Sequence, residues 1–366
     1  MLFISYFAIY VLSNASTTYE PSTSPAKHIA MGAIALVSLL AYPISAFRSL
    51  LLFLPVTIIY VLGSLANYAL VAAVFSLALP AVARTLNIIV ARRRLAVIAL
   101  LFAISLLPAL IALTKLDLES LWSSQYGRGR LLMGYWHPKE AAASFALPLV
   151  LWLVVMRKSV NVALALLLPA LLWIIGSRNV ALAVFLAIGL WRAPRTTRAI
   201  LAGVAIAALV LLAAINNYFD LVDELSSARL SVWFDALSDP SGLAEDGLAV
   251  GSRLAIDSYY VEVLASSGGA GLAIFGIWAM GFYAALGLSR PRFDLARPFF
   301  WAILFFAAFD SGIVSTGNMM HVMLWAFAAS PLILRTRRWR VFLMSPIQTW
   351  ARKPATRALP TQWESS

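Results

Sequence analysis

Apolar segments long enough to cross a bilayer recur along the whole chain and leave little room for any other fold. A membrane-spanning helix needs about 20 mostly apolar residues, because the hydrocarbon core is about 30 Å thick and each helical residue rises about 1.5 Å. Hydrophobic residues make up 62% of the 366-residue chain and charged residues 12%. A water-soluble domain carries about 25% charged residues, so this composition excludes one. The sequence therefore predicts an all-α, polytopic membrane protein with about twelve transmembrane helices. The expected spans are residues 1–13, 29–46, 49–64, 67–84, 95–113, 141–156, 160–175, 179–191, 199–215, 269–288, 298–314 and 319–334.

The basic residues fall in alternate connections between these segments. Twenty of the 28 Lys and Arg residues lie on one side, where Asp294 and Glu364 are the only acids. By the positive-inside rule this side is cytoplasmic, and it holds both termini. These arginines are topology signals, so we expect no nucleic-acid partner. The first segment has no basic head or cleavage site and is predicted to be an anchor rather than a removable signal peptide. We expect one helical domain over residues 1–344 and a disordered cytoplasmic tail over 345–366.

Two connections on the opposite side are long, at residues 114–140 and 216–268, and that side holds the remaining eight basic residues. They are Lys27, Lys115, Arg128, Arg130, Lys139, Arg178, Arg229 and Arg253. Arginine grips phosphate through paired hydrogen bonds, so the group indicates an anionic ligand such as a lipid-linked phosphate. The alternative is that each of these Lys and Arg residues forms an ion pair with a nearby Asp or Glu. Ion pairing explains Arg178 least well, because the turn 176–179 between two apolar segments contains no Asp or Glu. Placing an unpaired charge inside the membrane costs about 2.5–3.5 kcal/mol of insertion free energy.

A carboxylate near the end of the second long loop is a candidate general base. Arg253 and Asp257 are four residues apart and would face each other across one helical turn, so the pair has a purely structural interpretation. The functional interpretation places Asp257 at an aqueous mouth, with Tyr259 and Tyr260 beside it, where it would accept a proton. Glu262 is the second choice for this role. Both interpretations stay open.

The end of the first long loop combines aromatic and polar residues. Arg128 and Arg130 precede the run 135–140, Tyr-Trp-His-Pro-Lys-Glu. Such a cluster suits a sugar face, yet Tyr and Trp also concentrate at membrane interfaces without any catalytic purpose, so both interpretations stay open. His137 and Pro138 are predicted to begin a helix, with proline in its first turn.

The composition argues against a metal-binding site. The chain has no Cys and three His, so a histidine or thiolate metal site is not expected, and no cofactor is expected either. The methionines around His321 are more typical of packing than of metal ligation. Asp310, at the outer end of an apolar segment, either faces the aqueous mouth or makes a buried polar contact.

Four segments resemble one family. The first is the Arg-x-Arg stretch followed by His137-Pro138-Lys139, which is similar to a His-Pro-Asn motif in an outer loop. The second is the Gly-Ser-Arg turn at 176–178, and the third is Arg229 followed four residues later by Trp233. The fourth is Asp257-Ser258, then Gly268, then Gly271. Together, over roughly residues 115–290, they resemble the Wzy-type O-antigen and capsular polysaccharide polymerases, which share a superfamily with the O-antigen ligases.

The resemblance implies a metal-independent, inverting glycosyltransferase of the C class (GT-C), in the inner membrane of a bacterium and active on its periplasmic face. It would transfer a growing glycan from undecaprenyl pyrophosphate to a lipid-linked repeat unit in polysaccharide biosynthesis. Asp257 would be the base, and Arg178 and Arg229, with Arg253, would hold the departing pyrophosphate. Arg128 and Arg130 would bind the acceptor pyrophosphate. The expected partners are these lipid-linked oligosaccharides, the lipid bilayer and a chain-length regulator protein.

Three other functions are weighed against the polymerase. One is a non-catalytic scaffold, which would need no cluster of outer arginines. An O-antigen ligase would join the glycan to the lipid A core, but Asp257 stands where the ligases have histidine. A polysaccharide transporter or flippase would place charges near the middle of its spans. The predicted spans here are almost free of charge in their interiors, which disfavours the transporter.

Overall fold

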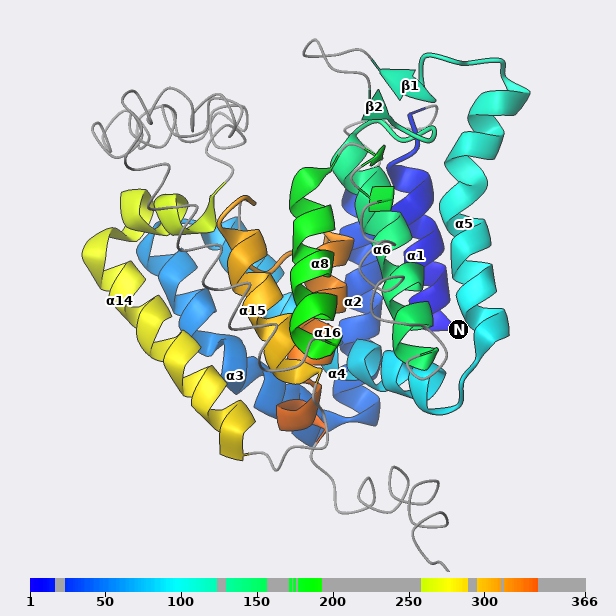
Figure 1. Cartoon of the computed structure of the whole chain (residues 1–366). Coiled ribbons are helices and arrows are strands. Elements are labelled where there is room, and N and C mark those ends of the chain that lie inside the picture. The colour runs from blue at the N-terminus through cyan, green and yellow to red at the C-terminus, as the bar shows by residue number, and fades with distance from the viewer. Residues whose placement is uncertain are drawn as a thin grey trace, which may run out of the picture. The chain divides into compact units, whose positions relative to one another are not determined.

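The structure, a computed structural model, describes residues 1–16, 24–123, 130–156, 171–172, 174–175, 177–192, 258–288, 295–310 and 313–334. This part of the chain is helical apart from one pair of two-residue strands (Figure 1). Residues 1–334 belong to one compact unit. The helices are α1 (Leu2–Ser13), α2 (Ser24–Ala41), α3 (Pro43–Leu62), α4 (Ala66–Ala91), α5 (Leu95–Thr114), α6 (Pro138–Val155), α8 (Arg178–Arg192), α14 (Tyr259–Leu288), α15 (Ala296–Ala307) and α16 (Met319–Ile333).

The apolar character of these helices indicates a membrane-embedded protein. Five of them, α3, α4, α5, α6 and α14, are long and apolar enough to cross a membrane, and the other five are apolar but shorter. Together they overlap ten of the twelve predicted segments. The predicted segment 199–215 and most of 160–175 lie outside the described residues, as do the second long loop up to residue 257 and the predicted tail.

The helix α4 runs past its predicted end. The apolar segment was expected to stop near Arg84, but the helix continues to Ala91. The guanidinium of Arg84 lies over the ring of Tyr42, 4.5 Å from the ring centroid, so the charge is held by an aromatic face rather than in a loop. One turn further on, Asn87 donates a 2.6 Å hydrogen bond to the hydroxyl of Ser330 in α16. Neither polar residue therefore needs to end the helix.

The helix α14 is two helical segments joined at a sharp bend. Gly268 has φ 63° and ψ −164°, a backbone region that is essentially open to glycine alone. The segment after the bend, 269–288, matches the predicted span. The segment before it belongs to the predicted outer loop, and Ser267 there donates to the carbonyl of Ile59 at the end of α3, at 3.1 Å. Gly268 is one of the residues that carry the family resemblance, and the backbone conformation at this bend requires a glycine.

Replacing Gly268 by alanine is expected to strain this bend and lower the stability of the protein. The cost of holding a Cβ in that region is on the order of 1–3 kcal/mol. Thermal unfolding of the purified protein in detergent would measure it. Gly276→Ala is the matched control, because a Cβ at Gly276 in the same helix meets no atom within 4 Å. Equal melting temperatures for the two variants would contradict the assignment of strain to Gly268.

An aromatic cluster centred on Trp325 holds four helices together. Its ring lies with centroid distances of 4.8–6.1 Å from Phe53 of α3, Trp278 and Phe282 of α14, and Phe300 of α15. The indole nitrogen donates a 2.7 Å hydrogen bond to the carbonyl of Ile313, so the buried polar atom is satisfied. This packing fixes the connection between α15 and α16 relative to α3 and α14.

The first long loop is attached to the end of α1. The strands β1 (Trp122–Ser123) and β2 (Arg130–Leu131) pair in antiparallel fashion, and a single bridge joins Ala15 to Tyr135. Burial raises the pKa of the Tyr135 phenol above its ordinary value, and its hydroxyl donates to the carbonyl of Ser105 at 3.0 Å. The chain therefore enters α6 from a defined position.

Candidate functional site

Six helix ends meet through polar side chains at one end of the bundle, which we call the polar end. They are the end of α1, the starts of α2, α6 and α8, the end of α15 and the start of α16. All six belong to the side that the arginine pattern assigns to the outside. The side chains are Tyr10, Asn14, Lys27, His28, His137, Lys139, Glu140, Arg178, Asn179, Asp310, Thr316, Asn318 and His321.

The first turn of α6 supplies three of these residues. His137 has an extended backbone (φ −141°, ψ 137°), and its Nδ1 accepts a 3.1 Å hydrogen bond from the backbone N–H of Lys139. Pro138 follows as the first helical residue, where a missing N–H costs nothing. Glu140 in the first turn suits the positive end of the helix dipole. The predicted helix start is confirmed, and His137 is its cap.

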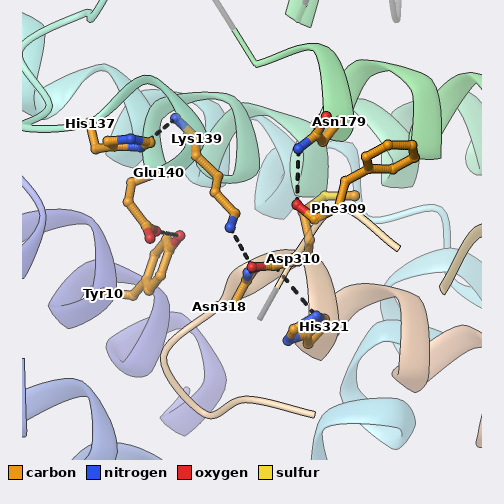
Figure 2. Close-up of polar contacts among 10 residues, drawn as sticks. Tyr10, His137, Lys139, Glu140, Asn179, Phe309, Asp310, Asn318 and His321 are labelled. Atoms are coloured by element: carbon orange, nitrogen blue, oxygen red, sulfur yellow. Dashed lines mark hydrogen bonds and ion pairs between the residues drawn. The ribbon is translucent and has the colours of Figure 1, made fainter. Parts of the chain in front are cut away.

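Lys139 extends from this turn toward α15 and forms an ion pair with Asp310 (Figure 2). The Asp310 side chain is 3% exposed and that of Lys139 is 22% exposed. The other carboxylate oxygen accepts a 2.7 Å hydrogen bond from the amide of Asn318, and Nε2 of His321 lies 3.7 Å from it. Asp310 thus makes a buried polar contact, and for Lys139 the pairing alternative is confirmed.

Glu140 extends toward Tyr10 of α1 instead (Figure 2). Its Oε2 accepts a hydrogen bond from the hydroxyl of Tyr10, a residue that is fully buried. Successive helical residues point about 100° apart, so the neighbours Lys139 and Glu140 reach different helices. The charges of Lys27, Lys139 and Asp310 all act on the Glu140 carboxylate. Glu140 is therefore coupled electrostatically to the start of α2 and to the ion pair at the end of α15.

The starts of α2 and α16 close the polar end on the side of α1. Asn14 accepts hydrogen bonds from Lys27 at 3.5 Å and from the indole of Trp136 at 3.2 Å. His28 contacts the hydroxyl of Thr316, whose carbonyl accepts a 2.7 Å hydrogen bond from Tyr6. Trp136 is 41% exposed, so one aromatic surface borders this polar group.

Arg178 reaches the same end of the bundle as the first residue of α8. It is partly buried. Its neighbour Asn179 donates a 3.0 Å hydrogen bond to the carbonyl of Phe309, next to Asp310 (Figure 2). The helix α8 packs against both α6 and α15. The structure therefore brings together the His137 and Arg178 segments, which the sequence analysis selected separately.

The other predicted site residues that the structure describes lie at the start of α14. Tyr259 is buried, with its ring 6.0 Å from Tyr60 and 5.4 Å from Phe275. Tyr260 donates a 2.6 Å hydrogen bond to the carbonyl of Leu304 in α15. Glu262 is 6% exposed. These side chains belong to the packing between α3, α14 and α15.

Asp257, Arg229, Arg253 and Arg128 lie outside the described residues. The backbone of Arg130 pairs with Ser123 between β1 and β2.

Sequence reasoning missed Tyr10 and Asn318 and did not connect Asp310 and His321 to Lys139. A charge at the end of an apolar segment was the available signal for Asp310. Tyr10 gave none, because a tyrosine in an apolar run is ordinary. The methionines flanking His321 are buried, which confirms the packing interpretation. Within the described ranges, no group of three or more His, Cys, Asp or Glu could hold a metal ion.

The polar end combines chemical groups that suit a ligand with both anionic groups and hydroxyls. Lys27, Lys139 and Arg178 are partly buried cations, and Glu140 is a partly buried carboxylate. Cations pair with phosphate oxygens, and carboxylates accept hydrogen bonds from hydroxyls.

No family of known proteins, no curated protein and no solved structure matches this chain.

Proposed function

We propose that this chain is a polysaccharide polymerase, with about twelve spans in a C-class glycosyltransferase architecture. It transfers a growing glycan from undecaprenyl pyrophosphate to a lipid-linked repeat unit, inverts the anomeric centre and needs no metal ion. The protein lies in a bacterial inner membrane, with both termini in the cytoplasm and the polar end in the periplasm. The family resemblance over residues 115–290 supports this proposal.

One observation carries it: two of the four family-like segments meet at the polar end. Lys139 binds Asp310, and Asn179 binds the carbonyl of Phe309, so the turn of His137 and the turn of Arg178 flank the end of α15. A donor with a pyrophosphate and an acceptor with sugar hydroxyls need cations and hydrogen-bond acceptors in one place. The polar end offers both kinds of group at the ends of apolar helices.

The proposed chemistry assigns roles by charge. The leaving pyrophosphate gains negative charge as its bond to the sugar breaks, and preorganised cations stabilise that charge. Arg178 supplies this at the polar end, together with Arg229 and Arg253 from the second long loop. Arg128 and Arg130 bind the acceptor pyrophosphate. A carboxylate takes the proton of the acceptor hydroxyl, a role that the resemblance assigns to Asp257.

The test is to incubate the purified protein with synthetic lipid-linked repeat units in the presence of a chelator. Longer lipid-linked glycans, separated on gels and weighed by mass spectrometry, are the expected products. A parallel reaction with lipid A core as acceptor distinguishes the ligase, which would extend the core and make no longer repeats. Substrate that stays at its original length in both reactions would contradict the glycosyltransferase.

A transporter is the second candidate, and one observation favours it. Asp310 is a buried charge at the end of an apolar helix, joined to Lys139 and close to His321. Ionisable groups in such positions often mark transport pathways. Proteoliposomes distinguish the two functions, because a transporter would move fluorescent lipid-linked repeat units between leaflets without lengthening them.

A further inference from the structure

Glu140 and Asp310 belong to the polar end, and Glu262 is buried near the start of α14; these three carboxylates differ in what their oxygens contact. Asp310 is engaged on both oxygens, by Lys139 on one and by Asn318 on the other. Glu262 is 6% exposed, and its Oε2 is sealed from water. Neither presents an oxygen to a ligand that arrives at the polar end.

Glu140 is the exception. It is partly exposed, and among the described residues Tyr10 is the one side chain that hydrogen-bonds its carboxylate, through Oε2. The second oxygen, Oε1, accepts no hydrogen bond from any described residue. Tyr10 itself is 0% exposed and fixed in the core against α6, so its hydroxyl holds Glu140 in one orientation. A carboxylate that is held through one oxygen, and whose other oxygen accepts no hydrogen bond from the described residues, is arranged to receive a hydroxyl proton.

The surroundings of Glu140 match the two substrates of the proposed reaction. The charges of Lys27 and Lys139 both act on the carboxylate, and Arg178 lies at the same end of the bundle. Lys27 and Arg178 suit the pyrophosphate groups, since Lys139 is already paired with Asp310, whereas Oε1 of Glu140 suits a neutral hydroxyl. Trp136 adds an exposed aromatic surface beside the first turn of α6, and aromatic faces pack against the apolar faces of sugar rings.

We propose that Glu140 is the base that takes the proton of the acceptor sugar; this assignment rests on the polymerase function proposed above. The O–H bond of the acceptor hydroxyl breaks and its proton moves to Oε1 of Glu140. The electron pair left on the acceptor hydroxyl oxygen forms the new glycosidic bond to C1 of the donor sugar. The bond from C1 to the phosphate oxygen breaks, and the lipid pyrophosphate leaves with its electron pair. Tyr10 is a positioning residue, because it acts through Glu140.

The decisive experiment measures steady-state elongation by Glu140→Gln in purified protein. Glutamine keeps the shape of Glu140 and can still accept from Tyr10, but it takes up no proton. We expect kcat to fall by about 100-fold or more for Glu140→Gln with KM for the acceptor nearly unchanged, and melting temperature as in the wild type. Glu119→Gln, an exposed carboxylate in the first long loop, is the matched control and should leave kcat unchanged.

Tyr10→Phe keeps the test meaningful if Glu140→Gln does not fold. Losing one hydrogen bond to the base should lower kcat about tenfold and leave KM unchanged, a split that general loss of packing would not produce. Full activity of Glu140→Gln would overturn the proposal, as would full activity of Tyr10→Phe where the first variant does not fold. A wild-type protein that makes no elongated product would instead refute the polymerase itself.

Discussion

Replacing Asp310 by alanine is expected to cause the largest loss of stability of any single change at the polar end. The substitution leaves the Lys139 ammonium without its counter-charge and removes the acceptor of the Asn318 amide. Breaking a fully buried ion pair costs about 3–5 kcal/mol. The Lys139 side chain is 22% exposed, so water screens part of the cost, and we expect about 2–3 kcal/mol. The melting temperature in detergent should fall by about 5 °C.

A double-mutant cycle with Lys139→Met separates the ion pair from the other contacts of Asp310. Methionine fills the same space without a charge, so in the double variant no unpaired ammonium remains. The two changes together should then cost less than the sum of the single changes. Glu119→Ala, at an exposed carboxylate, should leave the melting temperature unchanged. Strictly additive effects would mean that the pair contributes nothing beyond local packing.

Replacing Arg178 by alanine is expected to have the largest effect on activity while the protein still accumulates in the membrane. In the proposed reaction the guanidinium stabilises the pyrophosphate as it departs, and removing one such donor costs about 10²–10³ in rate. The elongation of lipid-linked repeats by purified protein measures this directly. In cells, the ladder of polymer lengths on gels should disappear. The variant should bind acceptor as the wild type does, because the charge acts on the donor.

Two further variants define what Arg178 contributes. Lysine at this position keeps a positive charge but lacks the planar pair of donors, so it should restore little of the rate. Arg192→Ala removes an arginine at the opposite end of the same helix and should leave elongation unchanged. Wild-type rates in Arg178→Ala would end the assignment of Arg178 to the leaving group, whatever the result for Glu140.

The described helices show which helix bounds can be predicted from neighbouring residues alone. The spans at 95–113 and 141–156 were predicted closely, because the thickness of the bilayer sets the length of an apolar segment and no distant contact is needed, whereas the helix predicted at 49–64 begins six residues earlier, at Pro43. The start of α6 was also predicted from neighbouring residues, since a cap and a proline act within one turn. The end of α4 was not, because the contact that holds Arg84 is made by Tyr42, a residue distant in sequence at the junction of α2 and α3.

The amino-acid sequence alone determined that this protein is a helical membrane protein, which segments are apolar, and which turns carry unusual charges. Only the tertiary structure decided how those charges are used. Lys139 meets Asp310 across 171 residues and Glu140 meets Tyr10 across 130, and neither partner could be chosen from spacing. The reason is physical: hydrophobicity and capping act over one helix, whereas the choice of partner for a buried charge depends on which helix ends the packing of the bundle brings together.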